Sequence, residues 1–302
     1  MRTSLTVLAL AAALAVPLRA SAALSVVTTT EGLAALAKEV GGDRVKVESL
    51  SRGVQDPHFV DANPMLAVKL RNADLLVDMG LDLEIGWLPP LVNQSRNAGI
   101  QPNGPRRLTA ASVIQVADVP TGPVDRSLGD LHPGGNPHFL TDPRRALQVA
   151  GAIAERLGQL DPAGQATYQR NLAAFTQRLQ ADMARWQQAL ATVKGRKVLD
   201  RHRTLTYFYD WSGIVDDGEL EPRPGVPPPP SRVVEMVEVA RRDRVKAILV
   251  ENYYDTKVAD VVAQHSGAKV VQIPGDVGGE PAAKDYPSYV DVLVKRVVGA
   301  LQ

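Results

Sequence analysis

The 302-residue chain contains no cysteine. This absence excludes disulfide bonds, thiolate metal sites and a lipid-anchored cysteine, so the fold must depend on burial of apolar side chains. Neither sign of charge is in excess, because 34 Lys and Arg balance 33 Asp and Glu. A near-neutral chain offers no electrostatic basis for binding nucleic acid, and no run of like charge indicates an anionic membrane surface.

Long hydrophobic runs are also missing, apart from one near the start. An apolar run over residues 5–18 follows a basic residue and precedes Ala-Ser-Ala at 20–22. This order is typical of a secretory signal peptide, and the run is shorter than the roughly 20 residues that cross a membrane. We therefore expect residues 1–22 to be a signal peptide and the mature chain to be a soluble, exported protein.

Short β-type runs alternate with helix-type runs in two series, over residues 24–97 and 196–301. This alternation predicts βαβ units and an α/β fold with parallel sheets. We place an N-terminal α/β lobe at 23–160 and a C-terminal α/β lobe at 195–302.

One long helical pattern at 161–194 separates the two series, with Asp161 as its expected N-cap. Apolar residues recur along it every three or four positions, which makes one stripe. About 30 residues at a rise of 1.5 Å make a rod of roughly 45 Å. This length favours a linking helix that runs past two lobes over an ordinary core helix of a single domain.

Two of the five histidines stand in near-identical surroundings: His58 in "QDPHFVDANP" and His138 in "NPHFLTDP". The proline before each histidine stiffens the backbone at the boundary of an element. A side chain aimed by a stiff backbone loses little conformational entropy when it binds a metal. Both histidines are therefore candidate metal ligands.

Further polar residues follow the predicted strands of the second series. His202 comes after "KVLD", Glu251 ends "AILVE" and Asp276 comes shortly after "VVQIP". In open α/β sheets ligands bind beyond the carboxyl ends of the strands. Three imidazoles and the Asp276 carboxylate form a sulfur-free set that suits Zn(II), because Mn(II) prefers more oxygen and Cu(I) softer donors.

The remaining candidates keep alternatives open. Glu251 is either the carboxylate ligand in place of Asp276 or, as we prefer, an acceptor that orients a metal-bound imidazole. His132, in the Gly- and Pro-rich loop 118–136, is interpreted as a surface residue, with a transient contact that closes the metal site as the alternative. His265 is assigned no function.

Four segments resemble, in the right order, motifs of the zinc- and manganese-binding periplasmic receptors of ABC importers, the ZnuA and TroA type. These segments are "QDPHFVDANP", "NPHFLTDP", "VLDRHRTLTYFYDWSG" and "AILVENYYDTKVADVVAQHSGAKVVQIPGD". The resemblance covers essentially the whole mature chain. It implies that His58, His138, His202 and Asp276 bind the metal between two lobes joined by a rigid helix.

The resemblance also implies a monomeric periplasmic protein that hands its metal to an inner-membrane ABC permease, with a periplasmic metallochaperone as a further partner. The chain departs from the family in two places. "VDANP" stands where Glu-Pro-Ser/Thr-Pro is usual, and loop 118–136 replaces the long His- and acid-rich loop of many zinc receptors. Manganese receptors tend to carry Glu at the third ligand position, so His202 favours zinc.

Rival functions are a manganese receptor of the same family, an adhesin and a secreted zinc hydrolase with Glu251 as its general base. The chain has no His-Glu-x-x-His, Gly-x-Ser-x-Gly or phosphate-loop pattern. A fourth protein ligand would also fill the position that a catalytic water needs. We therefore predict a zinc receptor and not an enzyme.

Overall fold

The computed structural model describes residues 23–122, 132–223 and 225–302, so the expected signal peptide and the middle of loop 118–136 lie outside the described residues. The N-terminal lobe contains a parallel sheet of order β2-β1-β3-β4. Its strands are β1 (Leu24–Thr28), β2 (Val45–Ser49), β3 (Leu75–Asp78) and β4 (Arg107–Thr109). Its helices are α1 (Glu31–Gly41), α2 (Pro64–Arg71), α3 (Leu88–Ser95) and α4 (Pro143–Leu160).

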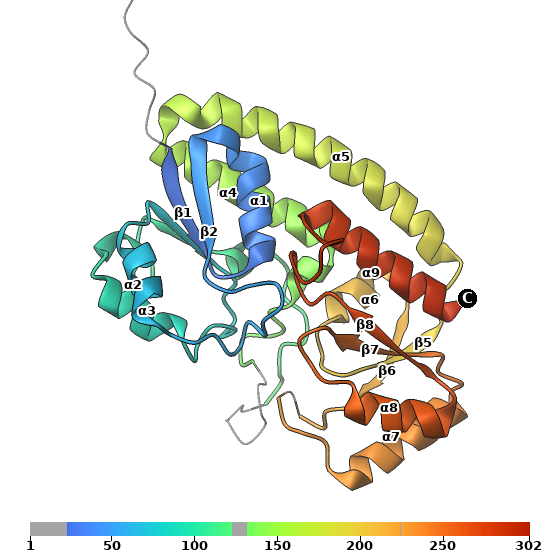
Figure 1. Cartoon of the computed structure of the whole chain (residues 1–302). Coiled ribbons are helices and arrows are strands. Elements are labelled where there is room, and N and C mark those ends of the chain that lie inside the picture. The colour runs from blue at the N-terminus through green and yellow to red at the C-terminus, as the bar shows by residue number, and fades with distance from the viewer. Residues whose placement is uncertain (1–22, 123–131, 224) are drawn as a thin grey trace, which may run out of the picture.

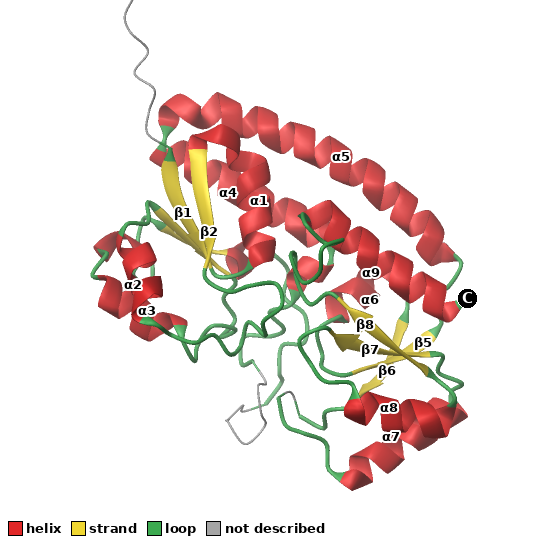
Figure 2. Ribbon diagram, in the orientation of Figure 1, coloured by secondary structure: helices red, strands yellow, loops and turns green. Residues whose placement is uncertain are grey.

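Helices cover both faces of this sheet (Figure 2), and alternate side chains of its inner strands enter two different cores. Val26 and Leu75 pack in the core that contains α1 and α4, whereas Val27 and Leu76 pack in the core that contains α2 and α3. A parallel sheet covered on both faces needs such continuously apolar strands. The run from 75 to 78 is therefore buried throughout.

The C-terminal lobe repeats the plan with a parallel sheet of order β6-β5-β7-β8. Its strands are β5 (Lys197–Asp200), β6 (Val215–Glu219), β7 (Ala247–Glu251) and β8 (Lys269–Ile273). Its helices are α6 (Thr206–Ser212), α7 (Pro230–Arg242), α8 (Lys257–Ser266) and α9 (Tyr286–Leu301). Helices α7 and α8 cover one face, and α6 and α9 lie on the other (Figure 1).

The two lobes are joined by α5 (Gln165–Ala191), a helix of 27 residues that runs along both of them (Figure 1). It packs on α1 and α4 in the first lobe and on α9 in the second. The predicted fold class, two parallel α/β lobes joined by one long helix, is confirmed. Asp161 is the N-cap residue of the 3-10 turn η6 (Pro162–Gly164), which leads into α5, but it makes no side-chain capping bond, and its carboxylate accepts hydrogen bonds from Arg44 and the Tyr168 hydroxyl.

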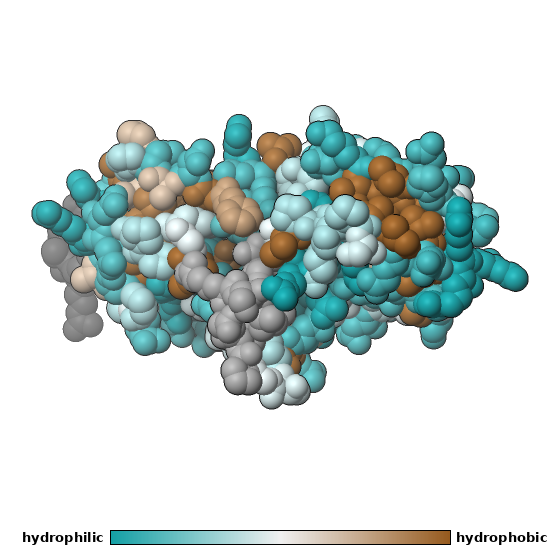
Figure 3. Space-filling view, turned by 90° about the horizontal axis from the view of Figure 1, so that it is seen from below, coloured by the Kyte–Doolittle hydropathy of each residue, from teal (hydrophilic) through white to brown (hydrophobic). Residues whose placement is uncertain are grey.

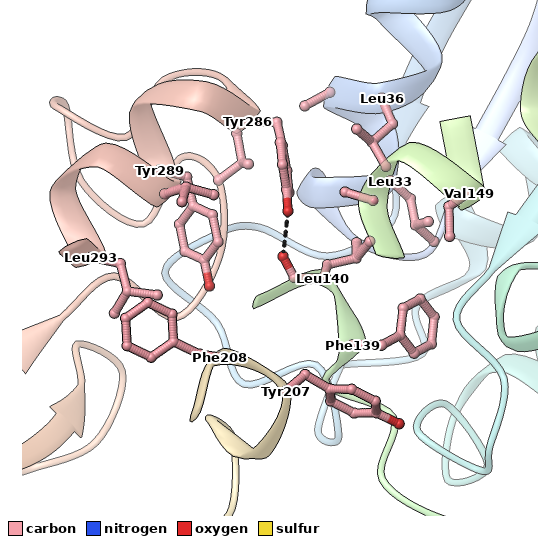
Figure 4. Packing of buried hydrophobic residues seen from close by; sticks show 14 of the residues in the cluster. Leu33, Leu36, Phe139, Leu140, Val149, Tyr207, Phe208, Tyr286, Tyr289 and Leu293 are labelled. Atoms are coloured by element: carbon pink, nitrogen blue, oxygen red, sulfur yellow. Dashed lines mark hydrogen bonds between the residues drawn. The ribbon is translucent and has the colours of Figure 1, made fainter. Parts of the chain in front are cut away.

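One continuous apolar core crosses the boundary between the lobes. Phe139 and Leu140, from the short 3-10 helix η5 (Phe139–Thr141) of the first lobe, face residues of α6 and α9 (Figure 4). The Tyr286 hydroxyl donates to the Leu140 carbonyl oxygen at 2.8 Å within this seam. An apolar, hydrogen-bonded interface of this kind limits the relative motion of two domains.

The surface is mainly hydrophilic, with separate apolar patches on the face seen in Figure 3. Phe59, Met65 and Ile85 are among the large apolar side chains that are more than half exposed, at 64, 67 and 56%. Within the described residues, no helix combines the length and the apolar character that crossing a membrane requires.

Candidate metal centre

His58, His138 and His202 come together between the lobes. His58 lies in the loop after β2, His138 immediately before η5, and His202 in the loop after β5. The three side chains each offer one ring nitrogen, and these atoms all lie within 4.8 Å of one another. The centroids of the three rings are 5.2–5.5 Å apart. Three residues separated by up to 144 positions therefore form a single site that could hold a metal ion.

His58 is held by the turn that contains its proline. The Asp56 Oδ1 atom accepts a hydrogen bond from the backbone N–H of His58 at 3.0 Å and contacts the ring Nδ1 at 2.7 Å. The Trp87 indole donates to the Pro57 carbonyl oxygen at 2.9 Å, which fixes the same turn. Burial tends to raise the pKa of Asp56, but its hydrogen bonds to His58 and Tyr254 outweigh burial and lower it. An ionised Asp56 therefore orients Nε2 of His58 towards the other two rings.

The ring nitrogen Nε2 of His138 is the clearest candidate for a metal-binding atom. Its backbone N–H donates to the Asn136 side chain at 2.9 Å, and the Tyr207 hydroxyl fixes the Asn136 carbonyl oxygen at 2.6 Å. The Nε2 atom of His138 is shielded from solvent and has no hydrogen-bond partner among the described residues. Burial, and then the nearby His58 and His202, lower its pKa well below the usual value. The imidazole is therefore neutral, which is the form that binds metals.

His202 is oriented by a carboxylate that the sequence did not single out. Its Nδ1 atom lies 3.0 Å from Glu221 Oε2, and the other Glu221 oxygen pairs with Arg201 at 3.3 Å. Burial alone would lower the pKa of His202, but Glu221 and further carboxylates outweigh it and raise the pKa. A ring N–H bound to a carboxylate is the usual arrangement behind a metal-bound imidazole.

Glu251, the residue expected to orient an imidazole, occupies a different position. It ends β7 and is buried, with a side-chain oxygen that has no hydrogen-bond partner within the described ranges. Burial raises its pKa. The carboxylate in contact with His202 is thus Glu221, which lies in the Pro-rich segment after β6. Its sequence position offered no signal that would distinguish it from its neighbour Glu219.

Asp276 lines the same small cavity as His138, but its carboxylate does not belong to the cluster of the three histidines. Its Oδ2 atom accepts a hydrogen bond from the Gly32 N–H, in the first turn of α1, at 3.1 Å, and its Oδ1 atom accepts one from the Val277 N–H at 2.8 Å. Burial is the main reason that its pKa is raised to about 7. In this structure Asp276 therefore links the two lobes through the start of α1.

His132 lies against the site rather than out on the surface. Its Nε2 atom is 3.3 Å from Nε2 of His58, and the two rings stack with their centroids 5.4 Å apart. Burial, and then the nearby His58 and His202, lower its pKa to about 3. Two nitrogens bound to one tetrahedral zinc at about 2.0–2.1 Å stand roughly 3.3 Å apart. The separation of His58 and His132 matches that value.

The fold and the site together define a two-lobed α/β protein with a cluster of histidines at the junction of its lobes. Residues 26–300 match the model of a protein family described as zinc-uptake complex component A, periplasmic (ZnuA). The chain belongs to this family.

Curated relatives are distant in sequence. The zinc-binding lipoprotein AdcA of Streptococcus pneumoniae serotype 4 is 23% identical over 283 residues, which cover 92% of this chain and 55% of AdcA. The chain thus spans about half the length of this relative. The manganese ABC transporter substrate-binding lipoprotein PsaA of Streptococcus pneumoniae is 27% identical over 253 residues, covering 82% of this chain and 78% of PsaA.

Among solved structures, a crystal structure of ZnuA superposes with a TM-score of 0.79 at 22% identity, over 93% of this chain and all of that chain. The laminin-binding protein Lmb of Streptococcus agalactiae reaches a TM-score of 0.74 at 22% identity, over 92% of this chain and all of that chain. These similarities establish the fold.

Proposed function

We propose that this protein is the receptor of an ABC importer and that it captures Zn(II) between its lobes. The observation that carries the proposal is the cluster of three imidazoles, one of which has a buried and unpartnered Nε2 atom. Neutral imidazoles held by carboxylates are typical zinc ligands. Family membership supports the transport role.

The donor set favours zinc over manganese. Three nitrogen ligands suit Zn(II), whereas Mn(II) prefers sites richer in oxygen. Both metals occur in the names of the relatives, since AdcA is called a zinc-binding lipoprotein and PsaA a manganese ABC transporter substrate-binding lipoprotein. The nitrogen-rich set is therefore the specific reason to propose zinc for this chain, and manganese remains the alternative cargo.

Two residues compete for the fourth ligand position. Asp276 could supply it by leaving its hydrogen bond to Gly32, and it already lines the cavity beside His138. His132 could supply it with little movement, because its Nε2 atom already stands 3.3 Å from that of His58. We keep Asp276 as the proposed ligand and His132 as the contact that closes the site.

The local chemistry supports a receptor rather than a hydrolase. A hydrolytic zinc site needs an open coordination position and a general base that reaches the bound water. The carboxylates of Asp56 and Glu221 contact the ring nitrogens of His58 and His202, so they orient imidazoles. Glu251, the candidate base, is only 2% exposed. We infer that the chain captures and releases metal without catalysis.

The setting follows from the family and the first residues. Export by a signal peptide at 1–22 would deliver the mature protein to the periplasm. There it would pass the metal to an inner-membrane permease, with a metallochaperone as a further partner.

Competition with a chromophoric zinc chelator, together with native mass spectrometry before and after chelation, tests the proposal. The wild type should bind one zinc ion. If a total binding free energy of about 10–16 kcal/mol is shared by four ligands, losing one costs about 2.5–4 kcal/mol, or roughly 10²–10³-fold in affinity. His138→Ala should show this loss, and His265→Ala, on the surface of α8, should not. Wild-type affinity in His138→Ala would refute the site.

The same titration decides the fourth ligand. Asp276→Ala and His132→Ala each remove one candidate, and only the variant that lacks the true ligand should lose affinity by this factor. Unchanged binding in Asp276→Ala alone would assign the position to His132. Unchanged binding in both would point to a three-histidine site completed by water, which would revive the hydrolase.

A further inference from the structure

We propose that Tyr254 is a positioning residue that couples the metal-binding histidines of the two lobes. The inference rests on the proposed function, because it concerns how the same site is built. Tyr254 lies just after β7 in the C-terminal lobe, and its side chain reaches across to the N-terminal lobe. It thereby connects, through two carboxylates, the imidazoles of His58 and His202.

The first connection is made by the Tyr254 hydroxyl. It donates a hydrogen bond to Asp56 Oδ2 at 2.9 Å, and the other Asp56 oxygen holds Nδ1 of His58 at 2.7 Å. Burial and the nearby Asp56 raise the pKa of Tyr254, so the phenol keeps its proton and remains a donor. One carboxylate therefore bridges a histidine of the first lobe and a tyrosine of the second.

The second connection is made by the Tyr254 ring. The Arg201 guanidinium lies over it, with Cζ 5.3 Å from the ring centroid, within the range of a cation–π contact. Arg201 pairs with Glu221 at 3.3 Å, and Glu221 holds Nδ1 of His202 at 3.0 Å. The Tyr254 ring also lies 6.2 Å from the ring of His202. The contacts thus run without a break from His58 through Tyr254 to His202.

Two other hydrogen bonds across the lobes lack this connection. Tyr286 donates to the backbone of Leu140, and Asp276 accepts from the backbone of Gly32. Neither bond includes a carboxylate that holds one of the three histidines. Tyr254 is therefore suited to set the relative position of two imidazoles, whereas Tyr286 is suited to hold the lobes together. A shift of even a fraction of an ångström matters, because ligand geometry must be held within about 0.5 Å.

Tyr254→Phe tests the hydroxyl connection, and Tyr286→Phe is the matched control because it also removes one tyrosine hydroxyl bonded across the lobes. Loss of a group that orients a ligand typically weakens metal binding about 10–100-fold. We expect this loss, faster release of zinc to a chelator and an altered visible spectrum of the Co(II) form in Tyr254→Phe. Tyr286→Phe should keep the affinity, release rate and spectrum of the wild type, although its metal-free form should melt at a lower temperature.

A double-mutant cycle with Asp56→Asn separates the connection from a general loss of packing. If Tyr254 acts through Asp56, Tyr254→Phe should have little further effect on zinc affinity in the Asp56→Asn background. Additive losses, or an affinity of Tyr254→Phe within twofold of the wild type, would overturn the inference. If instead the wild type binds neither zinc nor cobalt at one ion per chain, the proposed function itself fails.

Discussion

Replacing Asp276, which contacts α1, should change the free energy of unfolding in opposite directions at low and at high pH. Replacing Asp276 with Asn keeps the size of the side chain and removes its charge. In the native protein the carboxylate accepts one hydrogen bond at each oxygen, from Gly32 and Val277. An amide presents an NH2 group in place of one oxygen, so one of the two N–H donors loses its acceptor at every pH, whereas even a protonated carboxyl group keeps a hydroxyl oxygen that can accept. We expect that loss to cost about 1–2 kcal/mol.

Removal of the negative charge of Asp276 has the opposite effect on stability. The pKa of Asp276 is raised from 3.8 to about 7 in the folded protein, mainly by burial. A carboxyl group with a raised folded-state pKa contributes its full share of stability below about pH 4 and loses it as pH rises to about 7. A shift of about 3 units corresponds to at most about 4 kcal/mol. Asparagine has no proton to lose and escapes this cost.

Urea unfolding of the metal-free proteins at pH 3.5 and pH 8 measures both effects. Asp276→Asn should be less stable than the wild type at the lower pH by about 1 kcal/mol and more stable at the higher pH by about 2 kcal/mol. Because all other titrating groups are common to both proteins, the difference isolates this carboxyl group. A difference with the same sign and size at both pH values would refute the assignment of Asp276 as a carboxyl group with a raised pKa.

Three further predictions follow from single contacts. Glu221 raises the pKa of His202, so protons should compete with zinc for this imidazole as pH falls through the raised pKa. Chelator titrations should therefore show that zinc affinity begins to decline above pH 6.5, which is the ordinary pKa of a histidine. Gly32→Ala would place a Cβ atom 2.7 Å from the Asp276 carboxylate, so it should lower the thermal midpoint, whereas Gly151→Ala, with open space around it, should not. Trp186→Ala should destabilise the protein by about 3–5 kcal/mol in urea unfolding, because this side chain of α5 is 1% exposed.

Much of the fold could be predicted because its strands are covered on both faces. Runs such as "DLLVDMG" and "AILVE" must be continuously apolar to fill two cores, and apolar runs between helical patterns are visible in a single sequence. The helix α5 could also be predicted, because a helix that contacts both lobes needs one long stripe of apolar residues. His58 and His138 could be predicted as candidate ligands because the stiff segment Pro-His-Phe occurs twice in the sequence.

Strand β6 could not be predicted in this way. Its sequence "VDDGE" is mostly charged and shows no apolar alternation. It is a strand because it lies at the edge of the sheet, where it pairs with β5 on one side only. Lys197 and Arg203 also pair with carboxylates of Asp217 and Glu219 in this strand. Such support comes from residues that meet only in the folded chain.

The contacts of the site carboxylates were unpredictable for the same reason. Asp276 was correctly expected beyond the end of a strand, but the N–H of Gly32 that it accepts from lies 244 positions earlier. Glu221 reaches His202 through the turn after β6, where the Gly225 N–H also holds it at 2.7 Å. Sequence position indicates which edge of a sheet a side chain occupies. It does not indicate with which of several donors at that edge the side chain forms a hydrogen bond.

These contacts also determine how far zinc binding should stabilise the folded protein. Two of the histidine rings are held by Asp56 and Glu221, and the lobes that carry the histidines share one apolar core. A preorganised site loses little free energy to rearrangement on binding. The stabilisation of the protein by zinc, which follows RT ln(1 + [Zn]/Kd), should therefore reflect the bonds to the metal rather than a closure of the lobes. If the protein hands zinc to a partner as proposed, release should act on the ligands themselves. His132, whose Nε2 atom stands 3.3 Å from that of His58, is the ligand candidate that can be displaced without opening the apolar seam.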